Sequence, residues 1–512
     1  MSKQEEFFNH ITEGNTNKGE CITLGSAMLD GKTVKNAFVN VPLKTMNRHG
    51  LIAGATGTGK TKTLQVLAEN LSEKGVPVLL MDIKGDLSGL AQPSPGHIKI
   101  DERHEAIGIP FDPKAFPVEI LTLSTQNGVR LRATISEFGP VLISRILDVT
   151  ETQAGIISVI FKYCDDNKLP LLDLKDFKKI LQYATSEGKK EFEDAYGRIS
   201  TASTGAILRK IVEIEQQGGD IFFGEKSFDP QDLLRIDENG RGYINIIRLT
   251  DIQDKPKLFS TFMLSLLAEI YSTFPERGDS GRPELIMFID EAHLIFNEAS
   301  KALLNQIESI VKLIRSKGVG LYFVTQNPTD VPDAVLSQLG LKVQHALRAF
   351  TAKDRKAIKL TAQNYPDTEY YDTASVLTSL GTGEALVSAL NEKGRPTPLA
   401  ATMMRAPMSR MDILTDSELE DLLSDSKLVK KYNEEVDRES AYELLNKKIE
   451  QAEAEELKEK AKKEKEALEK AKSKSKGSST RKSTRMNPIV KVLTSATFIR
   501  SVFGILTKVM KK

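Results

Sequence analysis

The stretch RHGLIAGATGTGKT, residues 48–61, sets the architecture of this chain. Its first residues predict a buried strand, and GATGTGKT at 54–61 matches the pattern GxxxxGK[ST] at every position. Apolar residues then recur at helical spacing up to Leu71, and VPVLLMDIK at 76–84 predicts a second buried strand. This order predicts a βαβ unit in which the N-terminus of a helix lies directly behind a glycine turn.

The glycine turn carries the residue types that bind a nucleotide phosphate. Its backbone N–H groups from Thr56 to Lys60 can surround a phosphate, because glycine permits the tight loop. Lys60 is expected to reach the β- and γ-phosphates of ATP, and the Thr61 hydroxyl to ligate Mg²⁺. The expected nucleotide-binding residues are Gly54, Ala55, Thr56, Gly57, Thr58, Gly59, Lys60, Thr61 and Lys62.

A second motif, LIMFIDEAH at 285–293, places two acids directly after a hydrophobic strand. Asp290 is expected to hold the Mg²⁺ shell, and Glu291 to polarise the attacking water. Such a pair taken alone is more often a solvated loop, but a P-loop enzyme needs this strand, and no other apolar run ends in Asp-Glu. His293 is expected to be structural.

Two further polar groups follow strands of the same expected sheet. Gln326 in FVTQN could sense the γ-phosphate with its amide, or could belong to a strand-end turn set by Asn327 and Pro328. Asp82, Lys84 and Asp86 in MDIKGD could contact a nucleotide or nucleic acid, but a polar turn is the expected structure.

Composition restricts the class of protein. With 512 residues and 40% hydrophobic content, the chain can bury a large core, and no apolar run or N-terminal signal suggests a membrane protein, so we expect a cytoplasmic one. Cys21 and Cys164 lack metal-site spacing and are expected to be core residues. Residues 471–512 hold 11 of the 71 basic residues and none of the 70 acidic ones, so any DNA contact by the acidic body must be local.

Taken together, GATGTGKT, MDIKGD, FIDEAH and VTQNPTDVP resemble the HerA and FtsK branch of P-loop motors. Segments such as SEFGPVLISRILDVTETQAGI and GTGEALVSALNEKGRPTP further resemble the HerA-like bacterial proteins grouped as the DUF853 family, over about residues 20–445. The resemblance implies an α/β fold with a RecA-like ATPase core, a helical insertion, a homo-hexameric ring, and ATP-driven helicase or DNA translocase activity.

The same resemblance suggests a catalytic arginine supplied by a neighbouring subunit. Arg315 in KLIRSKGVG lies where the FtsK pattern places this residue, and Arg348 in HALRAF is the alternative; either could instead be an ordinary surface residue. Only about 45 residues precede the P-loop strand, too few for the N-terminal β-barrel of archaeal HerA, so the nuclease that docks on HerA rings is not implied.

The expected function is that of an ATP-dependent motor that moves DNA through a central channel. The rival hypothesis is a regulatory ATPase switch or scaffold that acts on a protein or membrane partner. Residues 489–512 predict a basic amphipathic helix that could lie on an anionic membrane, on the protein itself or near DNA.

The sequence predicts the following organisation. A short N-terminal segment occupies 1–45, the P-loop half of the core 46–131, a helical insertion 132–235, the other half of the core 236–405, C-terminal helices 406–472, and a basic linker with an amphipathic helix 473–512.

Overall fold

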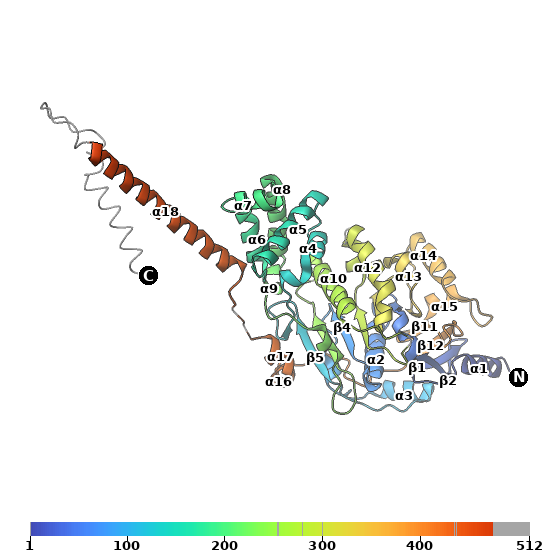
Figure 1. The fold of residues 1–512 in the computed structure, drawn as a ribbon. Helices are drawn as coiled ribbons and strands as arrows, with labels where there is room; N and C mark the ends of the chain where they lie inside the picture. The colour runs from blue at the N-terminus through green and yellow to red at the C-terminus, as the bar shows by residue number, and fades with distance from the viewer. Residues whose placement is uncertain are drawn as a thin grey trace. The chain divides into compact units, whose positions relative to one another are not determined.

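A computed structural model describes residues 2–474 except 253–254, 279, 299–300, 435 and 437. Twelve described strands form one sheet in the order β2-β1-β12-β11-β10-β3-β9-β8-β4-β7-β5-β6 (Figure 1). The strands are β1 (Cys21–Leu29), β2 (Lys32–Pro42), β3 (Gly50–Ala53), β4 (Val78–Asp82), β5 (Val118–Thr122), β6 (Val129–Arg130), β7 (Ile244–Arg248), β8 (Leu285–Ile289), β9 (Val319–Thr325), β10 (Leu341–His345), β11 (Glu384–Ser388) and β12 (Ala400–Met404).

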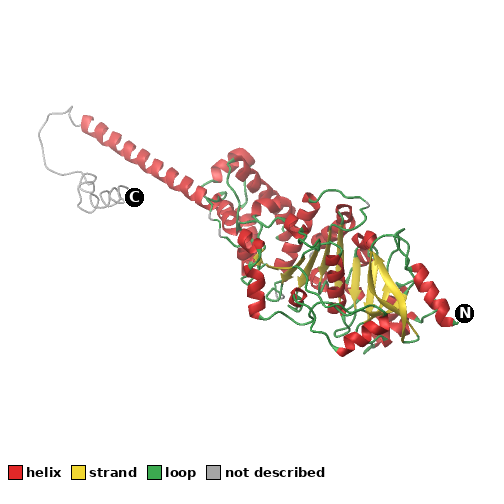
Figure 2. Ribbon diagram, turned by 90° about the horizontal axis from the view of Figure 1, so that it is seen from below, coloured by secondary structure: helices red, strands yellow, loops and turns green. Residues whose placement is uncertain are grey.

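Within the part of the sheet from β10 to β6, every pair of adjacent strands is parallel. Strands β3, β4, β8 and β9 are buried at every position, as expected for strands with helices on both faces. Figure 2 shows the strands lying between helices. The predicted α/β class with a mostly parallel sheet is therefore confirmed.

Strands β1, β2, β11 and β12 pair antiparallel and extend the sheet beyond β10. Residues 1–45, for which the sequence predicted only a short segment, thus contribute helix α1 (Lys3–Gly14) and two strands to the main sheet. Strands β5 and β7, which the sequence analysis did not identify, lie on the side of β4 away from β8.

Some of the larger helices surround the sheet, and the others form a group in the segment of the chain that connects β6 to β7. Around the sheet are α2 (Lys60–Glu73), α3 (Ile98–Ile107), α10 (Pro256–Thr273), α11 (His293–Glu298), α12 (Lys301–Ile314), α13 (Asp333–Leu336), α14 (Ala352–Gln363), α15 (Thr373–Ser379), α16 (Asp416–Ser424) and α17 (Lys427–Tyr432). Within the predicted insertion lie α4 (Ile135–Ile146), α5 (Glu151–Asp166), α6 (Leu174–Tyr183), α7 (Lys189–Tyr196), α8 (Thr201–Gln216) and α9 (Gly219–Phe222). Short 3-10 helices are η1 (Leu43–Arg48), η2 (Ser88–Ala91), η3 (Pro230–Leu234), η4 (Arg315–Lys317) and η5 (Pro328–Asp330).

The chain divides into two compact units, residues 1–445 and 446–512. The division falls inside helix α18 (Ala441–Lys474). The boundaries at 405/406 and 472/473 remain predictions. Residues 451–470 of α18 are exposed throughout and carry pairs such as Lys460–Glu456 at 3.2 Å. Among the described helices, none combines the length and apolarity needed to cross a bilayer. The predicted basic amphipathic helix lies outside the described residues.

Candidate active site

The sheet order gathers the sequence motifs at one edge. Strands β3, β9, β8 and β4 are consecutive and parallel, so their carboxyl ends lie side by side. The glycine turn follows β3, Gln326 follows β9, Asp290 and Glu291 follow β8, and Lys84 comes two residues after β4. Because β9 separates β3 from β8, the residue after β9 lies between the phosphate-binding turn and the acid pair.

The glycine turn has the form of an anion cradle. Gly57 and Gly59 have φ angles of 76° and 111°, which favour glycine, and helix α2 then begins at Lys60 with no side-chain cap on its first N–H groups. Gly54 is equally constrained, because a Cβ there would lie 2.5 Å from Cβ of His345. The first turn of α2 therefore presents unpaired N–H donors to a phosphate.

Lys60 points back into its own turn. Its Nζ donates to the carbonyl oxygens of Gly54 at 2.6 Å and Ala55 at 3.2 Å, and only 6% of the residue is exposed. Burial lowers the pKa of Lys60, nearby Lys84 lowers it further, and Glu291 and Asp290 oppose the change. The Lys60 ammonium group thus interacts electrostatically with both carboxylates of the acid pair.

The remaining predicted nucleotide residues differ in what they contact. The Thr58 hydroxyl donates to the Ala55 carbonyl at 2.7 Å and so stabilises the turn, whereas Thr56 and Gly57 are exposed and Thr61 is half-buried. Lys62 donates to the Met411 carbonyl at 2.6 Å. Its side chain is thus held by the 409–412 segment, and only its backbone N–H belongs to the cradle.

The acid pair is buried, and its backbone is strained. Asp290 and Glu291 are 3% and 8% exposed, and the Glu291 N–H donates to Asp290 Oδ1 at 2.9 Å. Glu291 has a φ of 46°, a left-handed conformation that non-glycine residues adopt with strain and that occurs often at functional sites. Burial raises the pKa of Asp290, as does the Glu291 carboxylate, while Lys84 opposes the change.

Lys84, which the sequence analysis assigned to a polar turn, lies beside the acid pair. Its Nζ lies 2.7 Å from Glu291 Oε1 and 3.6 Å from Asp290 Oδ2. The prediction of a turn holds for Asp82, whose carboxylate accepts from the N–H groups of Gly85, Asp86 and Leu87. Lys84 could have been identified as a cation just after the carboxyl end of β4, the strand next to the one that the acid pair follows.

His293, expected to be structural, also lies at the site. Its Nδ1 is 3.3 Å from Glu291 Oε2, and the side chain is 30% exposed. The contact does not have the geometry of a hydrogen bond, since Oε2 has no hydrogen-bond partner in the described part of the chain.

Gln326 is exposed at the end of β9, beside a rigid turn. Asp330 Oδ2 accepts from the Thr325 hydroxyl at 2.5 Å and from the Asn327 N–H at 3.1 Å, so the turn that follows β9 is fixed on both sides of Gln326. The strand-end turn, one of the two alternatives for this segment, is thus present. Its hydrogen bonds through Asp330 go to Thr325 and Asn327 and not to the Gln326 amide, which stays available to a phosphate.

His345, which the sequence analysis did not identify, supports the cradle from β10. Its Nδ1 donates to the Glu384 carbonyl at 2.9 Å, because a carbonyl only accepts, and its Nε2 then accepts from the Thr63 hydroxyl at 2.9 Å. Burial lowers the pKa of His345 to about 4, so the ring stays neutral. Next to it, the Gly383 N–H donates to the Thr58 carbonyl at 2.9 Å, and Arg103 donates to the Gly383 and Met404 carbonyls at 3.0 Å each.

The two candidate arginines lie at opposite ends of the strands. Arg315 begins η4, just before β9 starts at Val319. Burial lowers the pKa of nearby His49 to about 4, and the charge of Arg315 adds a smaller effect in the same direction. The strand β9 spans about 20 Å at 3.3 Å per residue, so Arg315 cannot reach the glycine turn of its own chain. Arg348 follows β10 at the carboxyl edge, is exposed, and donates to the Thr378 carbonyl at 3.5 Å.

The residues present fit MgATP. Mg²⁺ binds through one or two protein oxygens together with phosphates and water, which matches one hydroxyl at Thr61 and one carboxylate at Asp290. The cradle of glycine and uncapped N–H groups fits a phosphate chain, and Glu291 Oε2 is a buried acceptor that receives no hydrogen bond from the described residues. Bound Mg²⁺ would neutralise charge on the phosphates.

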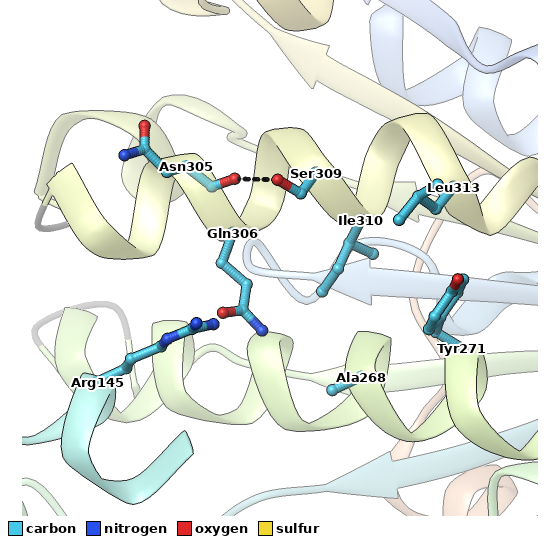
Figure 3. A pocket seen from close by; sticks show the side chains of 8 residues that line it. All are labelled: Arg145, Ala268, Tyr271, Asn305, Gln306, Ser309, Ile310 and Leu313. Atoms are coloured by element: carbon cyan, nitrogen blue, oxygen red, sulfur yellow. Dashed lines mark hydrogen bonds between the residues drawn. The ribbon is translucent and has the colours of Figure 1, made fainter. Parts of the chain in front are cut away.

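A separate groove lies between α4, α10 and α12 (Figure 3). Its volume is about 530 Å³, and it contains none of the motif residues. Its lining residues are Arg145, Ala268, Tyr271, Asn305, Gln306, Ser309, Ile310 and Leu313. The predicted nucleotide site is therefore distinct from this groove.

The family of the chain follows from a comparison with known sequences. The family model described as "Helicase HerA-like C-terminal" matches residues 28–512. The chain belongs to the HerA-like helicase family. This HerA-like protein thus has the family and the P-loop ATPase core that its motifs predicted.

Curated relatives carry the same name. The DNA double-strand break repair helicase HerA of Sulfolobus acidocaldarius is 25% identical over 370 residues, which cover 70% of this chain and 66% of the relative. The HerA of Sulfurisphaera tokodaii is 23% identical over 390 residues, or 76% of this chain and 69% of the relative. The HerA-like chain thus spans about two thirds of the length of these relatives.

Solved structures support the fold. The bacterial conjugative coupling protein TrwBdeltaN70 superposes with a TM-score of 0.52 at 15% identity, covering 80% of this chain and 95% of that one. TrwB in complex with ADP and Mg²⁺ gives a TM-score of 0.50 at 16% identity, with 79% and 94% covered. At this identity the likeness concerns the fold alone.

Proposed function

We propose that this HerA-like protein is a motor that hydrolyses MgATP and moves DNA as a homo-hexamer. The observation that carries the proposal is the division of the catalytic groups. Lys60, Glu291 and Gln326 lie at one edge of the sheet, and Arg315 lies at the other. A site with its arginine on the far edge is complete only when a neighbouring subunit supplies that residue, as in ring motors.

In the proposed mechanism each residue has a separate task. The glycine turn and Lys60 bind the phosphates, Thr61 and Asp290 hold Mg²⁺, and Glu291 accepts a proton from the attacking water through its Oε2. Gln326, placed between the cradle and the acid pair, would detect the γ-phosphate with its amide. Arg315 of a neighbouring subunit would stabilise charge on the same phosphate.

This arrangement predicts complementation between two inactive proteins. A mixture of Arg315→Ala and Lys60→Ala proteins should regain part of the ATPase activity, because some interfaces combine one intact cradle with one intact arginine. Steady-state ATP hydrolysis across a series of mixing ratios measures the effect. If mixed rings form and activity stays absent, the arginine acts elsewhere, and Arg348, at the carboxyl edge, becomes the candidate.

Support for DNA comes from two sources. The relatives are named as DNA repair helicases. In addition, the solvent face of α14 carries Lys353, Arg355, Lys356 and Lys359, all exposed, and follows Phe350, which is 87% exposed. Basic side chains beside an exposed aromatic ring suit a nucleic-acid backbone with an accessible base. In a body with excess acidic charge, this is a local surface of the kind that the sequence analysis required.

The function is tested by measuring ATP hydrolysis with and without duplex DNA, together with particle images in a non-hydrolysed ATP analogue. We expect DNA to raise the turnover rate and a six-fold ring to form. Turnover indifferent to DNA but altered by a lipid or protein partner would favour the regulatory switch instead. The location in the cytoplasm remains a prediction.

Reversing charge on α14 should weaken DNA binding. In the variant Lys356→Glu/Lys359→Glu, DNA affinity should depend less steeply on salt. The negative slope of log affinity against log salt concentration should become shallower by about 2, because two phosphate contacts are lost. The matched control is Lys189→Glu/Lys190→Glu, two exposed lysines on α7. Equal DNA affinity for both variants would contradict the role of α14, while basal ATPase without DNA should stay unchanged in both.

A further inference from the structure

The lysine beside the acid pair is held in a defined place. Lys84 Nζ lies 2.7 Å from Glu291 Oε1, and the lysine and glutamate side chains are 40% and 10% exposed. The glutamate end of this ion pair is thus buried, and the lysine end is partly exposed. An exposed pair contributes little, but a pair to a buried carboxylate fixes that carboxylate in one orientation.

The turn that carries Lys84 is rigid. Asp82 accepts from the N–H groups of Gly85 at 2.7 Å, Asp86 at 3.2 Å and Leu87 at 3.1 Å. Gly85 has a φ of 78°, and a Cβ there would lie 2.8 Å from Thr250 Cγ2, so the turn accepts no larger residue without movement. Strand β4 pairs with β8 up to Met81 and Ile289, which brings the two strand ends together. The backbone therefore places Lys84 beside the end of β8, where its side chain reaches Glu291.

Lys84 also supplies the charge that the acids require. Asp290 and Glu291 are adjacent and buried, and two carboxylates in this situation destabilise each other. Lys60 cannot satisfy both, since its Nζ is bonded to the Gly54 and Ala55 carbonyls. Among the salt bridges of the described residues, the cations paired with Glu291 are Lys84 and, if protonated, His293.

The two oxygens of Glu291 have different surroundings. Oε1 is held by Lys84, whereas Oε2 is buried, has His293 Nδ1 at 3.3 Å, and accepts no hydrogen bond from any described residue. A buried carboxylate oxygen without a donor is costly unless a ligand or water supplies one. In a general base, that oxygen is the one available to the attacking water.

We propose that Lys84 is a positioning residue for Glu291, whose Oε1 it holds so that Oε2 remains directed at the attacking water. This inference rests on the proposed role of Glu291 in ATP hydrolysis. Lys84 touches neither the water nor the reacting phosphorus in this arrangement. Its contribution lies in the orientation of the base and in the balance of charge around the acid pair.

The test compares Lys84→Met with Lys84→Arg in the full-length protein. Methionine should lower kcat by about 10- to 100-fold, because a misdirected base loses most of its effect, while KM for ATP changes less than about threefold. Arginine keeps a cation within reach of Oε1 and should recover a large part of kcat. The dissociation constant of a fluorescent non-hydrolysed ATP analogue with Mg²⁺, measured directly, should stay within about threefold for both variants.

The matched control is Lys114→Met. Lys114 is 41% exposed and pairs with Glu73 at 2.8 Å and Asp112 at 3.0 Å, so it resembles Lys84 in exposure and partners but contacts the far end of α2. In thermal unfolding without nucleotide, Lys84→Met should lower the midpoint more than Lys114→Met, and Mg²⁺ with the analogue should reduce the difference.

Three results would overturn the inference. The first is an unchanged kcat for Lys84→Met. The second is a raised kcat, which would make the ion pair inhibitory. The third is a loss of analogue binding equal to the loss of kcat, which would make Lys84 a phosphate ligand. A wild-type protein without ATPase activity, or a Glu291→Gln variant with normal activity, would instead refute the proposed function itself.

Discussion

Replacing Glu291 with Gln slows ATP hydrolysis by about 10²- to 10⁴-fold in our expectation, with nucleotide affinity nearly unchanged. The carboxylate acts on water and contacts no ground-state phosphate, so its loss reduces kcat and leaves binding intact. Glutamine has nearly the same volume and keeps one oxygen for Lys84 to contact at Oε1. Single-turnover hydrolysis and titration with a non-hydrolysed analogue measure the two quantities separately.

An equal loss of binding and turnover in Glu291→Gln would contradict this role. Asp290→Asn serves as the comparison, because loss of a metal ligand should reduce Mg²⁺-dependent binding as well as turnover. The two adjacent acids should therefore give different signatures. Identical signatures would mean that the division of roles along IDEAH is wrong.

Replacing Lys60 with Ala should reduce turnover by about 10²- to 10³-fold or more and also weaken nucleotide binding. The reason is that the ammonium group of Lys60, buried in the turn, is the side-chain cation placed to meet the β- and γ-phosphates. The same group donates to the Gly54 and Ala55 carbonyls, so its removal should also loosen the turn.

Lys74→Ala, at the other end of α2, is the control for Lys60→Ala. Lys74 lies 3.2 Å from Glu20 in an exposed pair, and its loss should leave hydrolysis unchanged. Normal hydrolysis by Lys60→Ala would refute the assignment of the nucleotide site.

The cradle and the acid pair could be predicted because each is a continuous motif. Local sequence places Lys60 at the start of a helix and Glu291 at the end of an apolar strand, so only the surrounding strand and helix pattern was needed. The fold class and the family followed from the same motifs and are confirmed. The roles of individual residues in catalysis remain predictions.

Contacts that depend on sheet order could not be predicted in this way. Lys84 reaches Glu291 only because β4 is the neighbour of β8, and His345 supports the cradle only because β10 is the neighbour of β3. The 1–45 segment was underestimated because its strands β1 and β2 join the sheet through β12, which lies more than 350 residues later in the chain. Strands that pair in the sheet but lie far apart in the chain leave no periodic pattern in the sequence that shows the pairing.

The length of β9 has a further consequence for kinetics. In the proposed arrangement, Arg315 and the glycine turn of one chain lie at opposite ends of β9, which spans about 20 Å, so a dissociated subunit would hold two half-sites that it cannot join. The specific activity should then fall on dilution, below the concentration at which subunits associate, even though the amount of folded protein is constant. The rate of hydrolysis would then depend on the association equilibrium of the subunits, so that assembly would switch hydrolysis on.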